Sequence, residues 1–195
     1  MVGLMKLTAI LFLGLAACSH NDNAAGMAKR GQQLVSMGGC ADCHTPKRFD
    51  PKLGMPVPDD THFLAGHPEG APDPDAQPGQ TDMAVIGPTF TSFKTGFGVV
   101  YSRNLTPDRE TGIGAWTPEQ FIQTMRTGHR QGTGRVLLPP MPWQNLAGAS
   151  DGDLRAIFAY LQSLPAVHNQ VPDPKVPPPA IAAIEASYAK AQVKP

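Results

Sequence analysis

The sequence is poor in charge, in cysteine and in long apolar runs, and each shortage excludes a class of protein. Charged residues make up only 16% of the 195 residues, and 16 basic side chains are balanced by 16 acidic ones. A chain without net charge lacks the basic surface that binds nucleic acid. Three cysteines are too few for a disulfide scaffold. No apolar run reaches the ~20 residues of a membrane-spanning helix, which excludes a polytopic membrane protein.

Glycine and proline, by contrast, are abundant. The 20 glycines and 21 prolines together form about a fifth of the chain, which indicates many turns and disfavours a large regular sheet. Residues 46–82 are especially rich in both, and we expect a long surface loop there. Residues 83–115 hold only short apolar pieces between turns, and no strand is predicted for them.

The N-terminus has the plan of a secretory signal, with Lys6 before a short apolar run and small residues after it. The four residues that end at Cys18 (Leu-Ala-Ala-Cys) resemble the lipobox of bacterial lipoproteins, in which the cysteine becomes the lipid-bearing N-terminus. The resemblance implies a signal peptide over 1–17, a lipid on Cys18 and a tether over 18–28. The folded part is then lipid-anchored to a bacterial membrane, on its periplasmic or outer face. Ordinary signal cleavage nearby, with Cys18 incidental, is the alternative.

One motif carries chemistry: Cys40-Ala41-Asp42-Cys43-His44, the C-x-x-C-H pattern of c-type haem attachment. Two thiols on one helical turn can each bond one vinyl group of the same porphyrin. The imidazole of His44 then reaches the iron from the proximal side. With Cys18 assigned to lipid, the cysteine count predicts one covalent haem c and leaves no cysteine over.

Two other kinds of site use the same cysteine spacing. A thioredoxin-like redox pair requires a β-α-β context, which the sequence does not show. Half of a zinc site requires a second cysteine pair, which the sequence also lacks. Haem attachment is therefore the prediction for Cys40 and Cys43.

Helix signals surround the motif. The best punctuated helix begins at a capping box formed by Thr117 and Gln120, with Pro118 at its first position, and stops at Gly128. Another begins after Ser150 and ends before Pro165. Two weaker helices are expected at residues 27–39 and, with Ile181, Ile184 and Tyr188 on one face, at residues 180–192.

A first helix, C-x-x-C-H, a late methionine and a closing helix, in this order, resemble the class I cytochrome c family. The stretch from Asn104 to Trp116 resembles cytochrome subunits of bacterial periplasmic dehydrogenases and their monohaem relatives. The resemblance implies an all-α fold, with a small cytochrome c domain over 29–168 in which 46–100 is a loop-rich insertion. A proline-rich linker and tail helix would follow over 169–195. It also implies that Tyr160 of the closing helix packs on Gly31 of the first.

The iron's second axial ligand is assigned to Met141. It lies between prolines just before the closing helix, as the distal methionine does in the resembled family, and the prolines restrict the backbone around it. A merely buried core methionine is the alternative. His129, which follows Gly128 and lies off the helix, is the rival ligand. The remaining methionines and histidines are assigned elsewhere: Met55, His62 and His67 to the exposed loop, Met125 to the core, and His20 and His168 to the flanks.

Further residues are candidates for contact around the haem. The carbonyl of Pro88 is a candidate acceptor for the second N–H of His44. Trp116 and Trp143 offer ring N–H groups to haem propionates, unless they are ordinary core tryptophans. A group of arginines either pairs with propionates, receives an acidic partner or forms a solvated face: Arg103, Arg109, Arg126, Arg130 and Arg135.

These residues predict an electron carrier rather than an enzyme, because two strong axial ligands close the iron to substrates. The resemblance implies a respiratory or dehydrogenase chain, with a dehydrogenase or oxidase as redox partner. The alternative is a haem enzyme, or a sensor of peroxide or gas, in which Met141 is displaced. In a third interpretation the 46–82 loop or the 180–195 tail is an interaction module.

Overall fold

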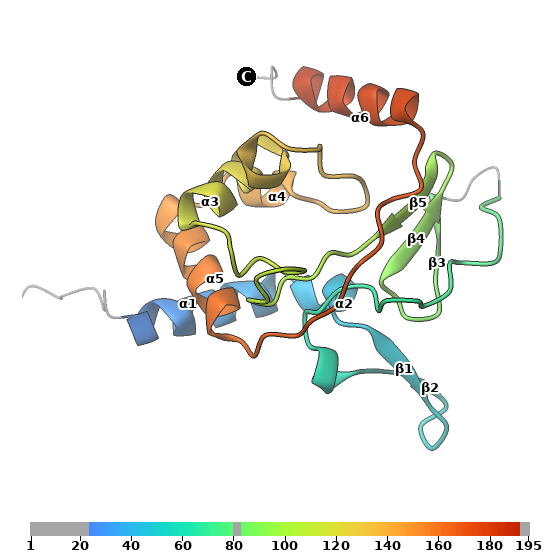
Figure 1. The fold of residues 1–195 in the computed structure, drawn as a ribbon, viewed down its shortest axis with the longest axis horizontal. Coiled ribbons are helices and arrows are strands. Elements are labelled where there is room, and N and C mark those ends of the chain that lie inside the picture. Colours follow the sequence, from blue (N-terminus) through green and yellow to red (C-terminus); the bar gives the residue numbers. More distant parts are fainter. Residues whose placement is uncertain (1–23, 80–82, 192–195) are drawn as a thin grey trace, which may run out of the picture.

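The computed structural model describes residues 24–79 and 83–191 (Figure 1). The predicted signal peptide, Cys18 and His20 lie outside these residues. In chain order the elements are α1 (Ala24–Met37), α2 (Cys40–His44), β1 (Lys47–Asp50), β2 (Met55–Pro58), the 3-10 turn η1 (Asp60–His62), β3 (Ala84–Ile86), β4 (Ser92–Thr95), β5 (Gly98–Tyr101), α3 (Pro118–Thr127), the 3-10 turn η2 (Arg130–Gly132), α4 (Gln144–Ala147), α5 (Asp151–Ser163) and α6 (Pro178–Ala191). None of the described helices is long and apolar enough to cross a membrane.

The expectation of an all-α fold is wrong, because two small antiparallel sheets accompany the helices. β1 and β2 form a hairpin, and β3, β4 and β5 form a three-stranded sheet in that order. In Figure 1 the helices α1, α3, α4 and α5 lie on one side and the three-stranded sheet on the other. The strands have only three or four residues each. Strands this short, among prolines and glycines, show too little alternation to be recognised from the sequence.

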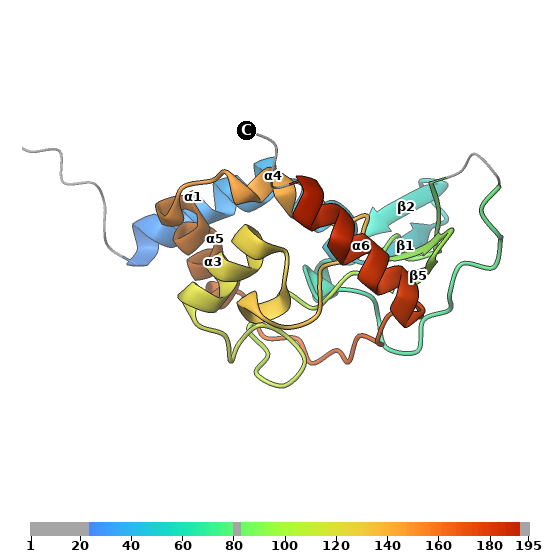
Figure 2. The same ribbon diagram turned by 90° about the horizontal axis from the view of Figure 1, so that it is seen from above.

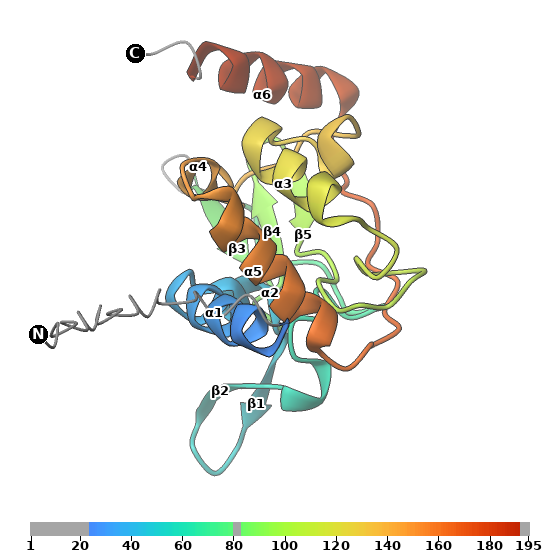
Figure 3. The ribbon, with the colours of Figure 1, turned by 90° about the vertical axis from the view of Figure 1, so that its left-hand side faces the viewer.

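Helices α1 and α5 cross at a glycine, as predicted. A Cβ atom on Gly31 would lie 1.9 Å from the carbonyl oxygen of Ala156 and 2.8 Å from the Cβ of Tyr160. Only a residue without a side chain permits this approach, so the expected packing of Tyr160 on Gly31 is confirmed. Figure 3 shows the two helices against each other, and Val35 and Leu161 are buried in the core that they share.

Helices α3 and α5 begin where the capping residues predict. Thr117 Oγ1 accepts a hydrogen bond from the N–H of Gln120 at 3.2 Å, and the Gln120 side chain accepts one from the N–H of Thr117 at 2.9 Å. Gly128 ends α3 in the left-handed conformation, with a φ of 70°. Ser150 caps α5 through its hydroxyl. The apolar faces of both helices meet in the main core.

Residues 64–67, expected in an exposed loop, are buried. His67 has no exposed surface; its Nδ1 accepts a hydrogen bond from Thr91 Oγ1 at 2.9 Å, and its Nε2–H faces the carbonyl oxygen of Ala71 at 3.4 Å. Burial lowers the pKa of His67, which keeps the ring neutral. The expectation of an exposed His67 is therefore wrong, whereas His62 is exposed as predicted.

The chain beyond α5 runs along the sheet before it reaches α6. Val99 of β5 and Lys175 form an antiparallel bridge, with N–O distances of 3.1 and 2.9 Å. α6 then lies above α3 and α4 in Figure 1, and from above it spans from these helices to β5 (Figure 2). Its apolar side chains pack on a second, smaller core formed by Phe93, Val100, Val136 and Leu138.

Candidate haem attachment site

The two thiols of the motif lie on one short helix. α2 starts after Gly39, which has a left-handed φ of 63°, and Cys40 and Cys43 lie one turn apart on it, where side chains are neighbours. Cys40 is half-buried, Cys43 is exposed, and neither is in a disulfide. Both thiols are therefore free and lie on one turn of the same short helix.

The surroundings of the thiols support neither of the two alternative sites. Burial raises the pKa of Cys40 above its usual value, and the nearby carboxylate of Asp42 adds to the effect. Burial also raises the pKa of Cys43, again with help from Asp42. A thioredoxin-like pair needs the opposite, a lowered thiol pKa. Within 24–79 and 83–191, no group of three or more Cys, His, Asp or Glu side chains gathers to hold a metal ion, so a zinc ligand set is not formed there.

His44 is buried and held by a single hydrogen bond. Its Nδ1–H donates to the carbonyl oxygen of Arg103 at 2.8 Å. Burial lowers the pKa of His44, only partly opposed by this bond, so the ring is neutral with its proton on Nδ1. The lone pair of Nε2 is then available to a metal. The structure gives the acceptor role to Arg103, whereas Pro88, the residue we considered for it, lies in the exposed turn between β3 and β4.

A short piece of chain around Gly66 braces this pair. The N–H of Gly66 donates to the carbonyl oxygen of His44 at 2.8 Å. A Cβ atom on Gly66 would lie 2.6 Å from the carbonyl carbon of Arg103, so the backbones are in direct contact. The buried side chain of Asn169 donates to the carbonyl oxygens on either side of Gly66, at 2.6 and 2.9 Å. Asn169 was not recognised from the sequence, because its contacts lie about a hundred positions away.

The stretch 104–114 fixes the backbone that follows Arg103. Asn104 Oδ1 accepts hydrogen bonds from the N–H and the hydroxyl of Thr106, at 2.9 and 2.7 Å. Asp108 Oδ1 accepts from the N–H and the hydroxyl of Thr111, both at 2.7 Å, and these bonds lower the pKa of Asp108. The polar side chains of residues 104–114 thus close a tight loop. This loop lies next to Arg103, whose carbonyl oxygen accepts the hydrogen bond from His44.

Lys47 secures the C-terminal end of α2 and was also missed. Its Nζ donates to the carbonyl oxygens of Ala41, Asp42 and Thr45, at 3.0, 3.3 and 2.8 Å. A cation is favoured at this end of a helix. The preference for lysine just after a helix was the available signal.

Met141 and Trp143 belong to the segment between η2 and α4. In Figures 1 and 3 α2 lies near the middle of the molecule, below α4. Met141 is half-buried, and Trp143 has only 1% of its surface exposed. The side chain of Tyr188 on α6 (Pro178–Ala191) lies against the indole, with ring centres 5.4 Å apart, and interacts with its polar edge. The indole is therefore packed as a core side chain, the alternative considered for it.

His129, the rival ligand, is engaged elsewhere. Its Nδ1–H donates to the carbonyl oxygen of Thr127 at 2.9 Å, and its Nε2 lies 3.0 Å from a carboxylate oxygen of Glu185 on α6. Neither nitrogen is left for an iron. Met125 is buried in the main core, and Met55 and Met83 are exposed. Met141 thus remains the predicted distal ligand.

The arginines divide into two groups. Arg126 joins helices, because it donates to the carbonyl oxygen of Ala147 and pairs with Asp151 at 2.6 Å. Arg103 and Arg135 are half-buried, and burial together with nearby guanidinium groups lowers the pKa of each. Arg130 belongs to the same charge cluster and lies 5.8 Å from the ring centre of the half-buried Trp116, whereas Arg109 is exposed. Arg103 donates to the carbonyl oxygens of Val171 and Pro172, at 3.3 and 3.0 Å, and lies 3.8 Å from a carboxylate oxygen of Asp173. Its guanidinium group is therefore already partly engaged within the protein.

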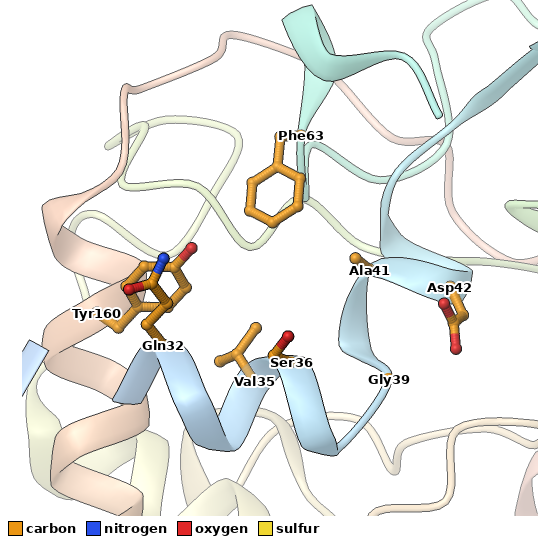
Figure 4. Close-up of a pocket in the computed structure, with 8 residues that line it drawn as sticks. All are labelled: Gln32, Val35, Ser36, Gly39, Ala41, Asp42, Phe63 and Tyr160. Carbon is orange, nitrogen blue, oxygen red and sulfur yellow. The ribbon is translucent and has the colours of Figure 1, made fainter. Parts of the chain in front are cut away.

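A pocket of 270 Å³ opens beside α2 (Figure 4). Figure 4 shows Phe63 pointing into it from above, with Gln32, Val35 and Ser36 of α1 below and Tyr160 at one side. Ala41 and Asp42 contribute from α2, but Cys40, Cys43 and His44 do not line it. The pocket therefore borders α2 on a side that includes neither thiol nor the imidazole.

Comparison with known proteins points to dehydrogenase complexes. No protein-family model matches the chain. It is 31% identical over 149 residues to a component of the nicotinate dehydrogenase of Pseudomonas putida, and the match covers 76% of this chain and 10% of that protein. It is 29% identical over 160 residues to the Gluconate 2-dehydrogenase cytochrome c subunit of Pantoea cypripedii, and the match covers 80% of this chain and 28% of that protein. A third relative is the cytochrome c subunit of Alcohol dehydrogenase (quinone) of Gluconobacter oxydans. It is 28% identical over 167 residues, and the match covers 84% of this chain and 27% of that protein.

These relatives include cytochrome c subunits of dehydrogenases. The chain spans between about a tenth and just over a quarter of their length. The residues present fit a covalent haem, on two observations of this structure: two free thiols one turn apart and an oriented imidazole.

Proposed function

We propose that this chain is a monohaem c-type cytochrome that carries single electrons for a dehydrogenase. The observation that carries the proposal is the hydrogen bond from His44 Nδ1–H to the carbonyl of Arg103, directly after two free thiols. Such an outer partner orients a ligating histidine and fixes its tautomer. Relatives named as cytochrome c subunits match the chain over most of its length.

One haem would be held, because the chain has a single C-x-x-C-H motif. Cys40 and Cys43 would bond its vinyl groups, and His44 and Met141 would ligate the iron. When bound, the haem supplies an iron that takes up and releases one electron. A methionine in the second axial position raises the reduction potential.

The remaining contacts of the haem would be polar and local to its edge. The half-buried guanidinium groups of Arg135 and of Arg103, whose Nη1 already donates to the carbonyl oxygens of Val171 and Pro172, would face its propionates. With His44 and Met141 both holding the iron, no position on it would remain open to a substrate. This arrangement favours a carrier over an enzyme or a sensor of peroxide or gas.

We also propose that the protein is exported and lipid-anchored through Cys18, with its folded part at the periplasmic or outer face of a bacterial membrane. The small polar residues 19–28 would form the tether. Its redox partner would be a dehydrogenase or oxidase, which docks near the exposed Cys43 through a small transient interface.

The test is the visible spectrum and intact mass of the purified protein. We expect a low-spin ferrous spectrum, a methionine-sulfur charge-transfer band in the ferric form, and a mass increased by one haem. Cys40→Ala and Cys43→Ala should abolish stable holoprotein, because one thioether anchors the haem poorly. A colourless wild-type protein without the added mass would refute haem attachment. A high-spin ferric spectrum or rapid carbon monoxide binding would favour the enzyme or sensor instead.

A further inference from the structure

The segment that carries Met141 has little regular structure of its own. The described residues between η2 and α4 form no strand of their own. Their strand-like pairing is a single bridge from Val136 to His129, which precedes η2. One side of the segment is fixed by α3, because a Cβ atom on Gly128 would lie 2.4 Å from the Trp143 indole. The N–H of Leu137 donates to the carbonyl oxygen of Gly128 at 2.7 Å.

The other side is covered by α6. The ring of Tyr188 lies 5.4 Å from that of Trp143 in an edge-on arrangement of 79°. Ile181 and Ile184 pack on the cluster that contains Val136 and Leu138. These α6 positions follow helical spacing, so one face of the helix contacts the segment on both sides of Met141.

A polar contact adds to this apolar face. Glu185, between Ile184 and Tyr188 on the helix, lies 3.0 Å from Nε2 of His129 at the base of the segment. His129 is also fixed to its own turn through the carbonyl of Thr127. The base and the indole end of the segment are therefore both tied to α6.

We propose that α6 is a clasp that holds the Met141 segment in its ligating conformation. This inference rests on the proposed haem ligation by Met141. In an open form of this segment, Met141 would lie away from the iron; in the closed form it would ligate it. Contacts that α6 makes only with the closed form determine what fraction of the molecules is closed. Tyr188 and Glu185 are positioning residues, because they act on Met141 through the segment.

The experiment compares three full-length holoprotein variants with the wild type. Tyr188→Ala removes the ring contact, Glu185→Gln removes the carboxylate charge beside His129, and Ala182→Ser on an exposed position of α6 is the matched control. The readouts are the methionine-sulfur band of the ferric form and the rate at which carbon monoxide binds the ferrous form. That rate reports the fraction of molecules with the distal position open.

We expect Tyr188→Ala to weaken the band and to speed carbon monoxide binding about tenfold, the scale on which the loss of a packed aromatic pair shifts a two-state equilibrium. Glu185→Gln should produce a smaller change of the same sign, and Ala182→Ser none. Haem content per chain should stay constant, since the thioethers do not involve α6.

Two outcomes separate this inference from the proposed ligation. If the wild type shows the band and Met141→Ala abolishes it, but Tyr188→Ala and Glu185→Gln leave both readouts unchanged, the clasp is refuted and the ligation stands. If the wild type shows no such band, the ligation by Met141 is refuted. Should Tyr188→Ala reduce folded yield, the milder Tyr188→Leu, which also removes the ring contact, and Glu185→Gln still decide the question through the carbon monoxide rate.

Discussion

Gly66 lies against the backbone of Arg103 so closely that a methyl group there would be 2.6 Å from the carbonyl carbon that accepts the His44 hydrogen bond. Gly66→Ala should displace that carbonyl and add left-handed strain at a φ of +80°. We expect the free energy of unfolding to fall by about 3 kcal/mol. Gly70→Ala is the control, because it has a φ of +74° with open space around it and should cost only about 1 kcal/mol. Equal losses in denaturant titration would show that the contact with Arg103 does not matter.

Met141→His should keep the iron low-spin but lower the reduction potential, because imidazole replaces a ligand that favours the ferrous form. Redox titration followed in the visible spectrum measures the change. Met83→Leu provides the control, since Met83 is 92% exposed and should leave the potential unaltered. An unaltered potential in Met141→His would mean that another group ligates the iron.

His67 should make stability depend on pH. Burial lowers its pKa from 6.5 in the folded state, so below that pH the unfolded chain takes up a proton that the folded chain does not. The free energy of unfolding therefore falls as pH drops below 6.5, by up to about 1.4 kcal/mol per pH unit. His67→Gln should make this dependence shallower, because the group whose pKa differs between the two states is removed. Identical slopes for wild type and His67→Gln, from urea titrations between pH 5 and 7, would contradict the assignment.

Cys18→Ser should abolish the lipid on the mature chain and release the protein from membranes, or leave an unprocessed precursor. Membrane fractionation and intact mass report both effects, with Ser19→Ala as control. If Cys18→Ser stays on the membrane in the same amount as the wild type, the anchor lies elsewhere. Haem content should not change, because Cys40 and Cys43 are untouched.

Local signals predicted a large part of this molecule. The capping box of Thr117 and Gln120 and the Ser150 cap depend on residues three positions apart, and both helices begin as expected. The glycine crossing of α1 and α5 followed from the family resemblance and is present. The attachment motif is confined to five residues, so its spacing could be read without knowledge of the fold.

Long-range pairings could not be read in this way. The hydrogen bond that orients His44 joins residues 59 positions apart, and Asn169 reaches back 104 positions to the carbonyl of Ala65. Nothing in the composition near His67 indicated that it would be buried, since its neighbours are prolines and glycines. The strands failed for a related reason: their pairing partners, rather than their own short sequences, make them strands.

The long distance in sequence between His44 and Arg103, whose carbonyl oxygen orients the imidazole, also has a consequence for how the site forms. The two sulfurs leave the ribosome long before Arg103 and Asn169 are made, and a five-residue helix does not persist by itself. Cys40 and Cys43 therefore lie on backbone without fixed structure until the residues that hold His44 have folded around it. The local geometry of the motif is thus a product of the complete tertiary structure rather than of the five residues alone.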